Sequence, residues 1–148
     1  MKIVYVDMDN VLVDFPSGIN QLSEEVKKEY EGRLDEVPHI FSLMPPMPKA
    51  IESYRLLAEK FDTYILSTSP WKNPTAAHDK FVWVRKYLGK EAHKRLILSH
   101  HKNLNKGDYL IDDRKFHNGA DKFEGELLHF GEGNPYPDWD AVIKYLIG

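Results

Sequence analysis

The sequence predicts an α/β protein in which a Rossmann-like parallel sheet is covered by helices on both faces, with a small helical cap insertion. Short apolar runs typical of buried strands alternate along the chain with longer amphipathic stretches typical of helices. Strands that alternate with helices form parallel sheets with right-handed crossovers. Several of the apolar runs also end in carboxylate or hydroxyl residues, as expected of a site at the carboxyl edge of such a sheet.

The first predicted strand contains Val4, Tyr5 and Val6 and runs directly into Asp7 and Asp9. The charged stretch 17–34 has a sparse helical periodicity, which predicts a small helix covered by solvent. Residues 37–48 carry four prolines, which exclude a regular helix or a central strand, so we interpret them as the return from an insertion. The expected domain organisation is a core of residues 1–15 and 47–148 and a small insertion of residues 16–46.

The remaining elements alternate regularly. Amphipathic periodicity predicts helices over residues 49–61, 75–89 and 138–147, the second of which ends at a glycine in the C′ position. Apolar runs predict strands over residues 63–70, 95–99, 108–113 and 126–130.

The composition excludes several classes of function. The 148 residues carry a formal net charge of −3, with 20 basic and 23 acidic residues, so charge favours neither duplex nucleic acid nor a membrane surface as a partner. The absence of cysteine excludes disulfides, thiol nucleophiles and cysteine zinc sites. Because the first strand begins at Ile3, we expect no signal peptide, and no apolar run approaches the length of a membrane span. A cytoplasmic location is expected, and the oligomeric state stays open.

Three predicted strands deliver polar side chains to one edge of the sheet. These are Asp7 and Asp9 after the first strand, Thr68 and Ser69 at the end of the second, and Asp112 and Asp113 at the end of the fourth. Lys80 lies in the first turns of the helix after the Thr/Ser loop. Four carboxylates in one crevice raise one another's pKa and call for a multivalent cation, and oxygen ligands favour Mg²⁺ over zinc. A magnesium ion, a lysine and a hydroxyl together suit a phosphoryl group.

Four segments, in this order, resemble the four motifs of the haloacid dehalogenase superfamily of phosphohydrolases: DMDNVLVDF, LSTSP, HDKFVWVRKYLG and LIDDR. More narrowly, they are similar to the 5′(3′)-deoxyribonucleotidases, and the closing YPDWDAVI is similar to the last helix of that family. The resemblance implies a magnesium-dependent phosphomonoesterase that hydrolyses (deoxy)nucleoside monophosphates through an aspartyl-phosphate intermediate. A phosphatase of the same superfamily acting on another small phosphorylated metabolite is the alternative.

The resemblance also implies roles for the polar residues. Asp7 would be the nucleophile, and Asp9 the general acid and base. Thr68 and Ser69 would bind the phosphoryl oxygens, and Lys80 would neutralise their charge. The metal ligands would be Asp7, Asp9 through its backbone carbonyl, Asp112 and Asp113, with the choice of direct ligand between the last two left open. Arg114 would reach the substrate or pair with a neighbouring acid.

The resemblance makes the insertion of residues 16–46 a cap over the site, and substrate choice is expected to lie there. Phe15, Phe41 and Trp71 are candidates to stack on a nucleobase, with core packing as the alternative for the two phenylalanines. Lys72, next to Trp71, could meet a phosphate or a sugar hydroxyl. The insertion is shorter than the cap of the animal nucleotidases, which leaves the nucleotide preference open.

Other functions fit the sequence less well. A receiver domain also combines acids, a hydroxyl and a lysine around a phosphorylated aspartate, but its acidic pair comes first, whereas Asp112 and Asp113 come last here. Asp9 argues against a dehalogenase, because displacement of halide needs no proton donor. The adjacent His100 and His101 lack a partner motif for zinc, so we expect them to be loop or surface histidines.

Overall fold

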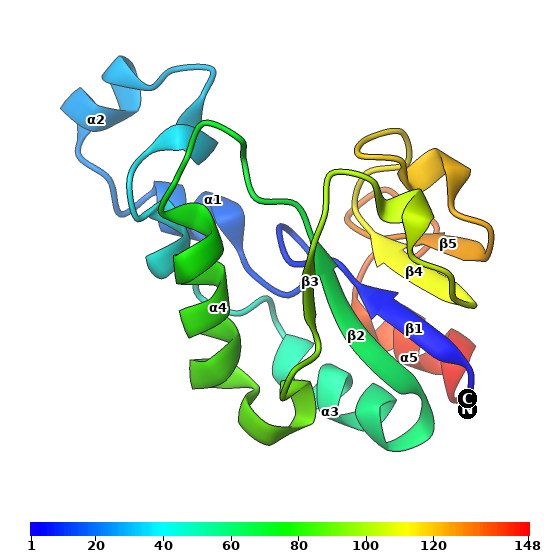
Figure 1. Cartoon of the computed structure of the whole chain (residues 1–148). Coiled ribbons are helices and arrows are strands. Elements are labelled where there is room, and N and C mark those ends of the chain that lie inside the picture. Colours follow the sequence, from blue (N-terminus) through cyan, green and yellow to red (C-terminus); the bar gives the residue numbers. More distant parts are fainter.

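The computed structural model describes residues 1–148 and contains one five-stranded parallel sheet (Figure 1). The strands are β1 (Ile3–Val6), β2 (Asp62–Ser67), β3 (Leu96–Leu98), β4 (Tyr109–Asp112) and β5 (Glu126–His129). Their order across the sheet is β3-β2-β1-β4-β5. In the centre, Val6 is in register with Ile65 of β2 and Ile111 of β4. The carboxyl end of β1 therefore lies between the carboxyl ends of β2 and β4.

Both faces of the sheet are covered, by different kinds of helix. The α-helices α3 (Ala50–Lys60), α4 (Ala76–Tyr87) and α5 (Trp139–Leu146) share the main apolar core with strand residues such as Val4 and Val6. Tyr5 points to the opposite face, where it packs with Leu110 and with Phe123 beside the short 3-10 helix η5 (Ala120–Lys122). The alternation of neighbouring strand residues between the two clusters is the two-residue period of a strand buried on both faces.

The strands and the three long helices begin and end within three residues of the predicted bounds. Gly89 follows α4 with a φ of +60°, the left-handed conformation expected of a C′ glycine. None of the helices is long and apolar enough to cross a membrane.

The prediction of a single helix over residues 17–34 is wrong. The structure has α1 (Phe15–Ile19) and α2 (Glu24–Glu29) instead, followed by the short 3-10 helices η1 (Leu34–Glu36) and η2 (Ile40–Ser42). Asp14 and Ser23 each cap a helix, accepting hydrogen bonds from the backbone N–H groups of Ser17 and Val26 at 3.2 Å. The cap at Ser23 begins a new helix in the middle of the predicted one.

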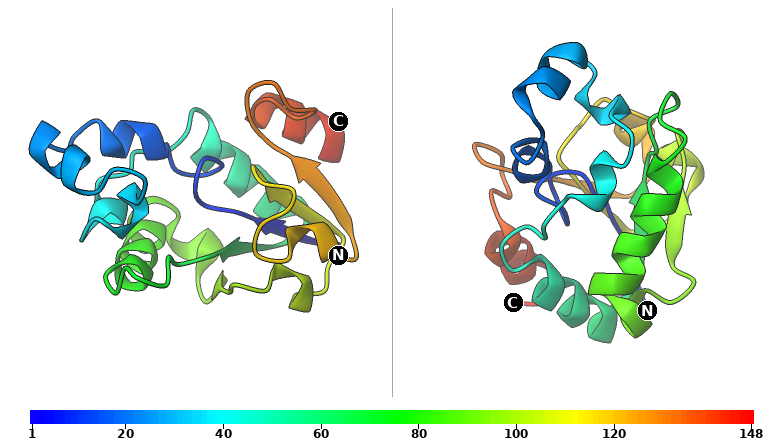
Figure 2. Two further views of the ribbon diagram at one scale, coloured as in Figure 1. Left: turned by 90° about the horizontal axis from the view of Figure 1, so that it is seen from above. Right: turned by 90° about the vertical axis from the view of Figure 1, so that its left-hand side faces the viewer.

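The insertion projects beyond the carboxyl ends of the strands, at the end of the molecule away from both termini (Figures 1 and 2). Its entry and exit meet where Val13 forms an antiparallel bridge with Pro46. Buried residues of its second half, among them Ile40 and Met44, belong to the same apolar cluster as the sheet, and the Trp83 indole N–H donates to the Met44 carbonyl at 2.9 Å. The division into a core of residues 1–15 and 47–148 and a cap of residues 16–46 stays a prediction.

Candidate active site

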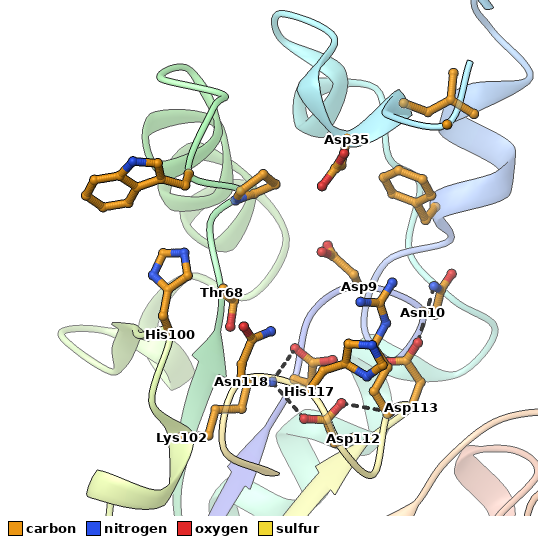
Figure 3. Close-up of a pocket in the computed structure, with 17 residues that line it drawn as sticks. Asp9, Asn10, Asp35, Thr68, His100, Lys102, Asp112, Asp113, His117 and Asn118 are labelled. Carbon is orange, nitrogen blue, oxygen red and sulfur yellow. Dashed lines mark hydrogen bonds and ion pairs between the residues drawn. The ribbon is translucent and has the colours of Figure 1, made fainter. Parts of the chain in front are cut away.

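A cavity of about 570 Å³ opens at the carboxyl edge of the sheet, between the strand ends and the insertion (Figure 3). This volume lies within the range of about 300–1,000 Å³ that is usual for small-molecule sites. The predicted site residues that line it are Asp7, Asp9, Phe15, Thr68, Trp71, Asp112, Asp113 and Arg114. The others, Phe41, Ser69, Lys72 and Lys80, are not part of its lining.

Asp7 lies at the bottom of the cavity because the sheet ladder continues one residue past β1, where the Asp7 N–H donates to the Ile111 carbonyl at 3.0 Å. Its carboxylate is paired with Lys102, which is not among the site residues predicted from the sequence. The Nζ of Lys102 lies 3.0 Å from Asp7 Oδ1 and 2.7 Å from Asp112 Oδ2, and all three side chains are buried. Burial favours the neutral form of Asp7, but the Lys102 ammonium, a hydrogen bond with Asp113 and the Lys80 ammonium together outweigh burial and hold the pKa of this carboxyl below its usual value. Asp7 is therefore ionised.

Asp9 forms an ion pair with the buried Lys80. Lys80 is completely buried, and its Nζ lies 2.8 Å from Ser67 Oγ, 2.8 Å from the Thr68 carbonyl and 3.3 Å from Asp9 Oδ2. Desolvation raises the pKa of Asp9 even though Lys80 opposes the shift, and Asp9 Oδ1 is buried with no hydrogen-bond partner. Asp9 thus combines a raised pKa with one unused oxygen.

The carboxylates of Asp7, Asp112 and Asp113 crowd together, with one oxygen of each within 4.8 Å of the others. Burial and the charge of Asp7 raise the pKa of Asp112 to about 7 and that of Asp113 to about 8. Three clustered carboxyl groups, of which Asp7 raises the pKa of the other two, offer only oxygen donors and fit a hard divalent cation.

The two neighbouring acids are engaged differently. Asp112 uses both oxygens within the protein, since Oδ2 accepts from Lys102 and Oδ1 accepts from the Arg114 N–H at 3.0 Å. Asp113 accepts only a long hydrogen bond of 3.4 Å from the amide of Asn10. Asn10 itself adopts a φ of +62° in the tight turn after Asp9, a conformation that asparagine tolerates. Asp113 is therefore the freer of the two acids to bind a cation.

The hydroxyls of the second strand end are also distinguished by their partners. Thr68 lines the cavity, but its hydroxyl donates to the Ser99 carbonyl at 2.7 Å. The Ser69 hydroxyl is buried without a partner. Ser69 is thus the residue with an uncommitted hydroxyl hydrogen, although it does not line the cavity.

The candidate substrate-binding residues divide into two groups. Phe15, Trp71 and Arg114 line the cavity, and Trp71 is 87% exposed. Phe41 is buried in the core with its ring below Lys80, in agreement with the alternative of core packing. Lys72 is exposed and lies outside the lining.

Lys102 was not among the site residues predicted from the sequence, and His100 was predicted to be a loop or surface histidine. Both line the cavity, and the His100 ring contacts Trp71 edge to face with 5.8 Å between the centroids. The signal for both was their position just after β3, because the carboxyl ends of parallel strands share one edge of the sheet.

Comparisons with known proteins identify the family of this chain. The sequence profile of the family described as 5′ nucleotidase, deoxy (pyrimidine), cytosolic type C protein matches residues 33–135. A protein of Vibrio phage KVP40, named as a 5′(3′)-deoxyribonucleotidase, is 60% identical over 97% of this chain and 84% of its own length. The human mitochondrial 5′(3′)-deoxyribonucleotidase is 28% identical over 95% of this chain and 68% of its own.

Solved structures show the same fold. A haloacid dehalogenase-like hydrolase from Streptococcus pneumoniae superposes with a TM-score of 0.60 at 15% identity, covering 99% of this chain and 91% of that one. A haloacid dehalogenase superfamily hydrolase from Geobacter sulfurreducens gives a TM-score of 0.60 at 11% identity, covering 99% and 96%. The strand order, the converging acids and these relatives together show that the chain belongs to the 5′(3′)-deoxyribonucleotidases, a family of phosphoric monoester hydrolases within the haloacid dehalogenase superfamily.

Proposed function

We propose that this protein hydrolyses deoxynucleoside monophosphates in a magnesium-dependent reaction with an aspartyl-phosphate intermediate. The observation that carries the proposal is the buried pair of Asp7 and Lys102 at the bottom of a cavity that also holds Asp9 and Asp113. An ionised carboxylate beside a fixed cation is suited to attack a phosphate ester, whose negative charge the cation offsets.

In the first step, an Asp7 oxygen forms a bond to phosphorus while the bond from phosphorus to the ester oxygen breaks. Asp9 gives its proton to the departing alkoxide, which requires Asp9 to be protonated when the substrate binds, and burial raises its pKa in that direction. In the second step, Asp9 takes a proton from water, which attacks the aspartyl-phosphate and releases inorganic phosphate and free Asp7. Asp9 thus regains the proton that it gave up.

For the phosphate itself, we assign the main positive charge to Lys102, because it lines the cavity and Lys80 does not. Lys80 remains a candidate catalytic residue through its contact with Asp9. Thr68, which lines the cavity, would donate to a phosphoryl oxygen after turning its hydroxyl from Ser99. Ser69 has a free hydroxyl but lies outside the lining, so it would donate to the phosphoryl group only after turning toward the cavity.

A magnesium ion would be held by Asp7, by Asp113 and by the backbone carbonyl of Asp9, which accepts no hydrogen bond from the backbone. Asp112 would act through Lys102, which it holds at 2.7 Å. When bound, the ion would neutralise charge on the phosphoryl oxygens and on the carboxylates around them.

The nucleoside would lie toward the outer part of the cavity. Phe15 and Trp71 line this cavity with aromatic rings, on which a base can stack without sequence-specific contacts. Arg114 lines it as well, and its guanidinium makes no ion pair within the protein, so it is available to a substrate oxygen.

A panel of phosphate esters, assayed for released phosphate with Mg²⁺ and with EDTA, tests the proposal. The panel should compare deoxyribonucleotides with ribonucleotides, 5′ with 3′ phosphates, and sugar phosphates as the alternative substrates. We expect Mg²⁺-dependent release from at least one deoxynucleoside monophosphate and none from Asp7→Asn. Full activity of Asp7→Asn, or in EDTA, would contradict the mechanism.

A further inference from the structure

Asn73 is a buried polar residue in the loop between β2 and α4, and it does not line the cavity. Asn73 is 3% exposed, and its side chain makes four hydrogen bonds. Its Nδ2 donates to the carbonyls of Asp35 at 2.9 Å and Val37 at 3.1 Å, and its Oδ1 accepts from the N–H and the hydroxyl of Thr75 at 3.1 and 2.7 Å. All the hydrogen-bonding positions of this amide are therefore filled.

These bonds join two segments that are far apart in sequence. On one side is the loop that follows Thr68, and on the other is the part of the insertion around η1. A further bond strengthens the junction, since the His39 N–H donates to Thr75 Oγ1 at 2.8 Å. A separation of this loop from the insertion would leave a buried amide and two carbonyls unsatisfied, which is costly.

The segment that Asn73 holds contributes directly to the cavity. Leu34 and Asp35 line it, and in Figure 3 the Asp35 carboxylate points toward the cavity from the side of the insertion, facing Asp9 across it. The Asp35 carboxylate has no hydrogen bond or ion pair within the protein, and only its backbone carbonyl is engaged. Its two carboxylate oxygens are therefore available to accept hydrogen bonds from a ligand in the cavity.

We propose that Asn73 is a positioning residue that fixes η1 over the cavity, so that Asp35 accepts a hydrogen bond from a neutral donor of the nucleoside, a sugar hydroxyl or a base amino group. This inference rests on the proposed function. It adds a requirement that the substrate carry such a donor at the end away from its phosphate, because an anionic group there would be repelled by Asp35.

The sharpest test is Asn73→Asp, which keeps the size of the side chain and the bonds from Thr75 but removes both donations to the insertion. The variant loses the two hydrogen bonds from Asn73 to the carbonyls of Asp35 and Val37, so Asp35 is held less firmly over the cavity. We expect the KM for a deoxynucleoside monophosphate to rise about tenfold, while kcat/KM for a small aryl phosphate stays within about twofold. Asp35→Ala should give the same pattern. The double variant should show less than the sum of the two effects, because Asn73 acts through Asp35.

Gln21→Ala is the matched control, because Gln21 donates from an amide to the Leu43 carbonyl at 2.7 Å within the insertion and does not reach the loop after β2. It should leave both substrates unchanged. Hydrogen exchange of residues 33–39 gives a readout that needs no substrate, and Asn73→Asp should speed exchange there but not in α2. The donor is identified by comparing wild type and Asp35→Ala on nucleotides that lack the 3′-hydroxyl and on nucleotides whose base lacks an amino group. The nucleotide that lacks the donor should have the same KM with both proteins.

An equal loss of activity toward both substrates in Asn73→Asp, or unchanged exchange in residues 33–39, would overturn the inference and leave the proposed function intact. A wild-type enzyme that hydrolyses aryl phosphate but no nucleotide would overturn the nucleotidase proposal and the assigned role of Asp35, while the exchange measurement would still test the contact made by Asn73.

Discussion

At the scale of single residues, the site depends most on the Lys102 ammonium, which joins two buried carboxylates at 3.0 and 2.7 Å. Lys102→Met keeps an apolar chain of similar length but leaves Asp7 and Asp112 without their cation. We expect the free energy of unfolding to fall by about 3–5 kcal/mol and kcat to fall at least about 100-fold. Urea unfolding and steady-state kinetics measure the two effects.

The control for this variant is Lys106→Met. Lys106 forms an exposed ion pair with Glu124 at 3.2 Å, and such pairs contribute little. Its removal should leave both quantities nearly unchanged. Retention of kcat in Lys102→Met would show that the phosphate does not lie beside this ammonium.

The role of Asp9 can be separated from that of the other acids by the leaving group. Asp9→Asn removes the proton donor, whose contribution is typically about 10²- to 10⁴-fold. The loss should be large for a nucleotide, whose leaving group is a poorly stabilised alkoxide, and much smaller for nitrophenyl phosphate, whose leaving group needs no proton. The measurement is the ratio of the wild-type kcat to the Asp9→Asn kcat, determined once with the nucleotide and once with nitrophenyl phosphate. Equal ratios for the two substrates would argue against a general acid at this position.

The pH dependence of the same reaction follows from the raised pKa of Asp9. The protonated form is the active one in the first step, so kcat/KM for the nucleotide should fall as the pH rises through this pKa. The fall should be weaker for nitrophenyl phosphate. A pH profile measured with both substrates checks the sign.

The strand-end acids and Thr68 could be predicted from sequence because each follows an apolar run directly, and parallel strands bring such positions together. The sequence did not allow us to predict that Lys102, rather than Lys80, lines the cavity. Lys80 is part of a recognisable helix pattern, yet the structure buries it against Asp9, while Lys102 follows the short edge strand β3 and reaches back to the centre of the sheet. Which of two lysines enters a cavity depends on long-range packing that a local pattern does not contain.

At the scale of elements, amphipathic patterns predicted the helices that pack on the sheet, but not the insertion. The periodicity of α3 and α4 reflects burial against one continuous core. The helices of the insertion are short, and their bounds depend on local caps such as Asp14 and Ser23. Weak periodicity over a charged stretch therefore gave one helix where the caps specify two.

The junction that enters β5 is constrained by backbone packing. A Cβ added at Gly125 would lie 2.5 Å from the carbonyl oxygens of both Gly107 and Asp108, which belong to the approach to β4. Gly125→Ala should therefore push β5 away from β4 and lower the free energy of unfolding by about 1–3 kcal/mol. Thermal unfolding against the exposed control Lys122→Ala measures the effect, and an unchanged melting temperature would show that the two segments can separate without cost.

At the scale of the whole molecule, function follows from the order of the strands. Alternating helices and strands predict a parallel sheet, but they do not say that β1 lies between β2 and β4. That order brings residues separated by about a hundred positions, such as Asp7 and Asp112, to the same lysine. The fold thus concentrates negative charge at one edge, and the free energy of the whole protein should respond when that charge changes.

The raised pKa values of Asp112 and Asp113 determine how the stability of the metal-free protein changes with pH. In the folded protein without metal, Asp112 and Asp113 have pKa values of about 7 and about 8, whereas carboxyl groups in an unfolded chain titrate near about 4. Between these values the folded state holds more protons than the unfolded state, so the contribution of these two groups to stability falls as the pH rises from about 4 to about 8. A divalent cation that takes the place of the protons reverses this loss.

We therefore expect the rise in melting temperature caused by excess Mg²⁺, relative to EDTA, to grow from about pH 6 to about pH 8, because the ion competes with fewer protons at the higher pH. Asp113→Asn removes a ligand and one of the repelling charges together, so it should be more stable than wild type in EDTA at about pH 8 and should gain little from Mg²⁺. Thermal unfolding of both proteins across this range measures the shift. An Mg²⁺ effect that is independent of pH, or that persists unchanged in Asp113→Asn, would mean that the ion binds elsewhere.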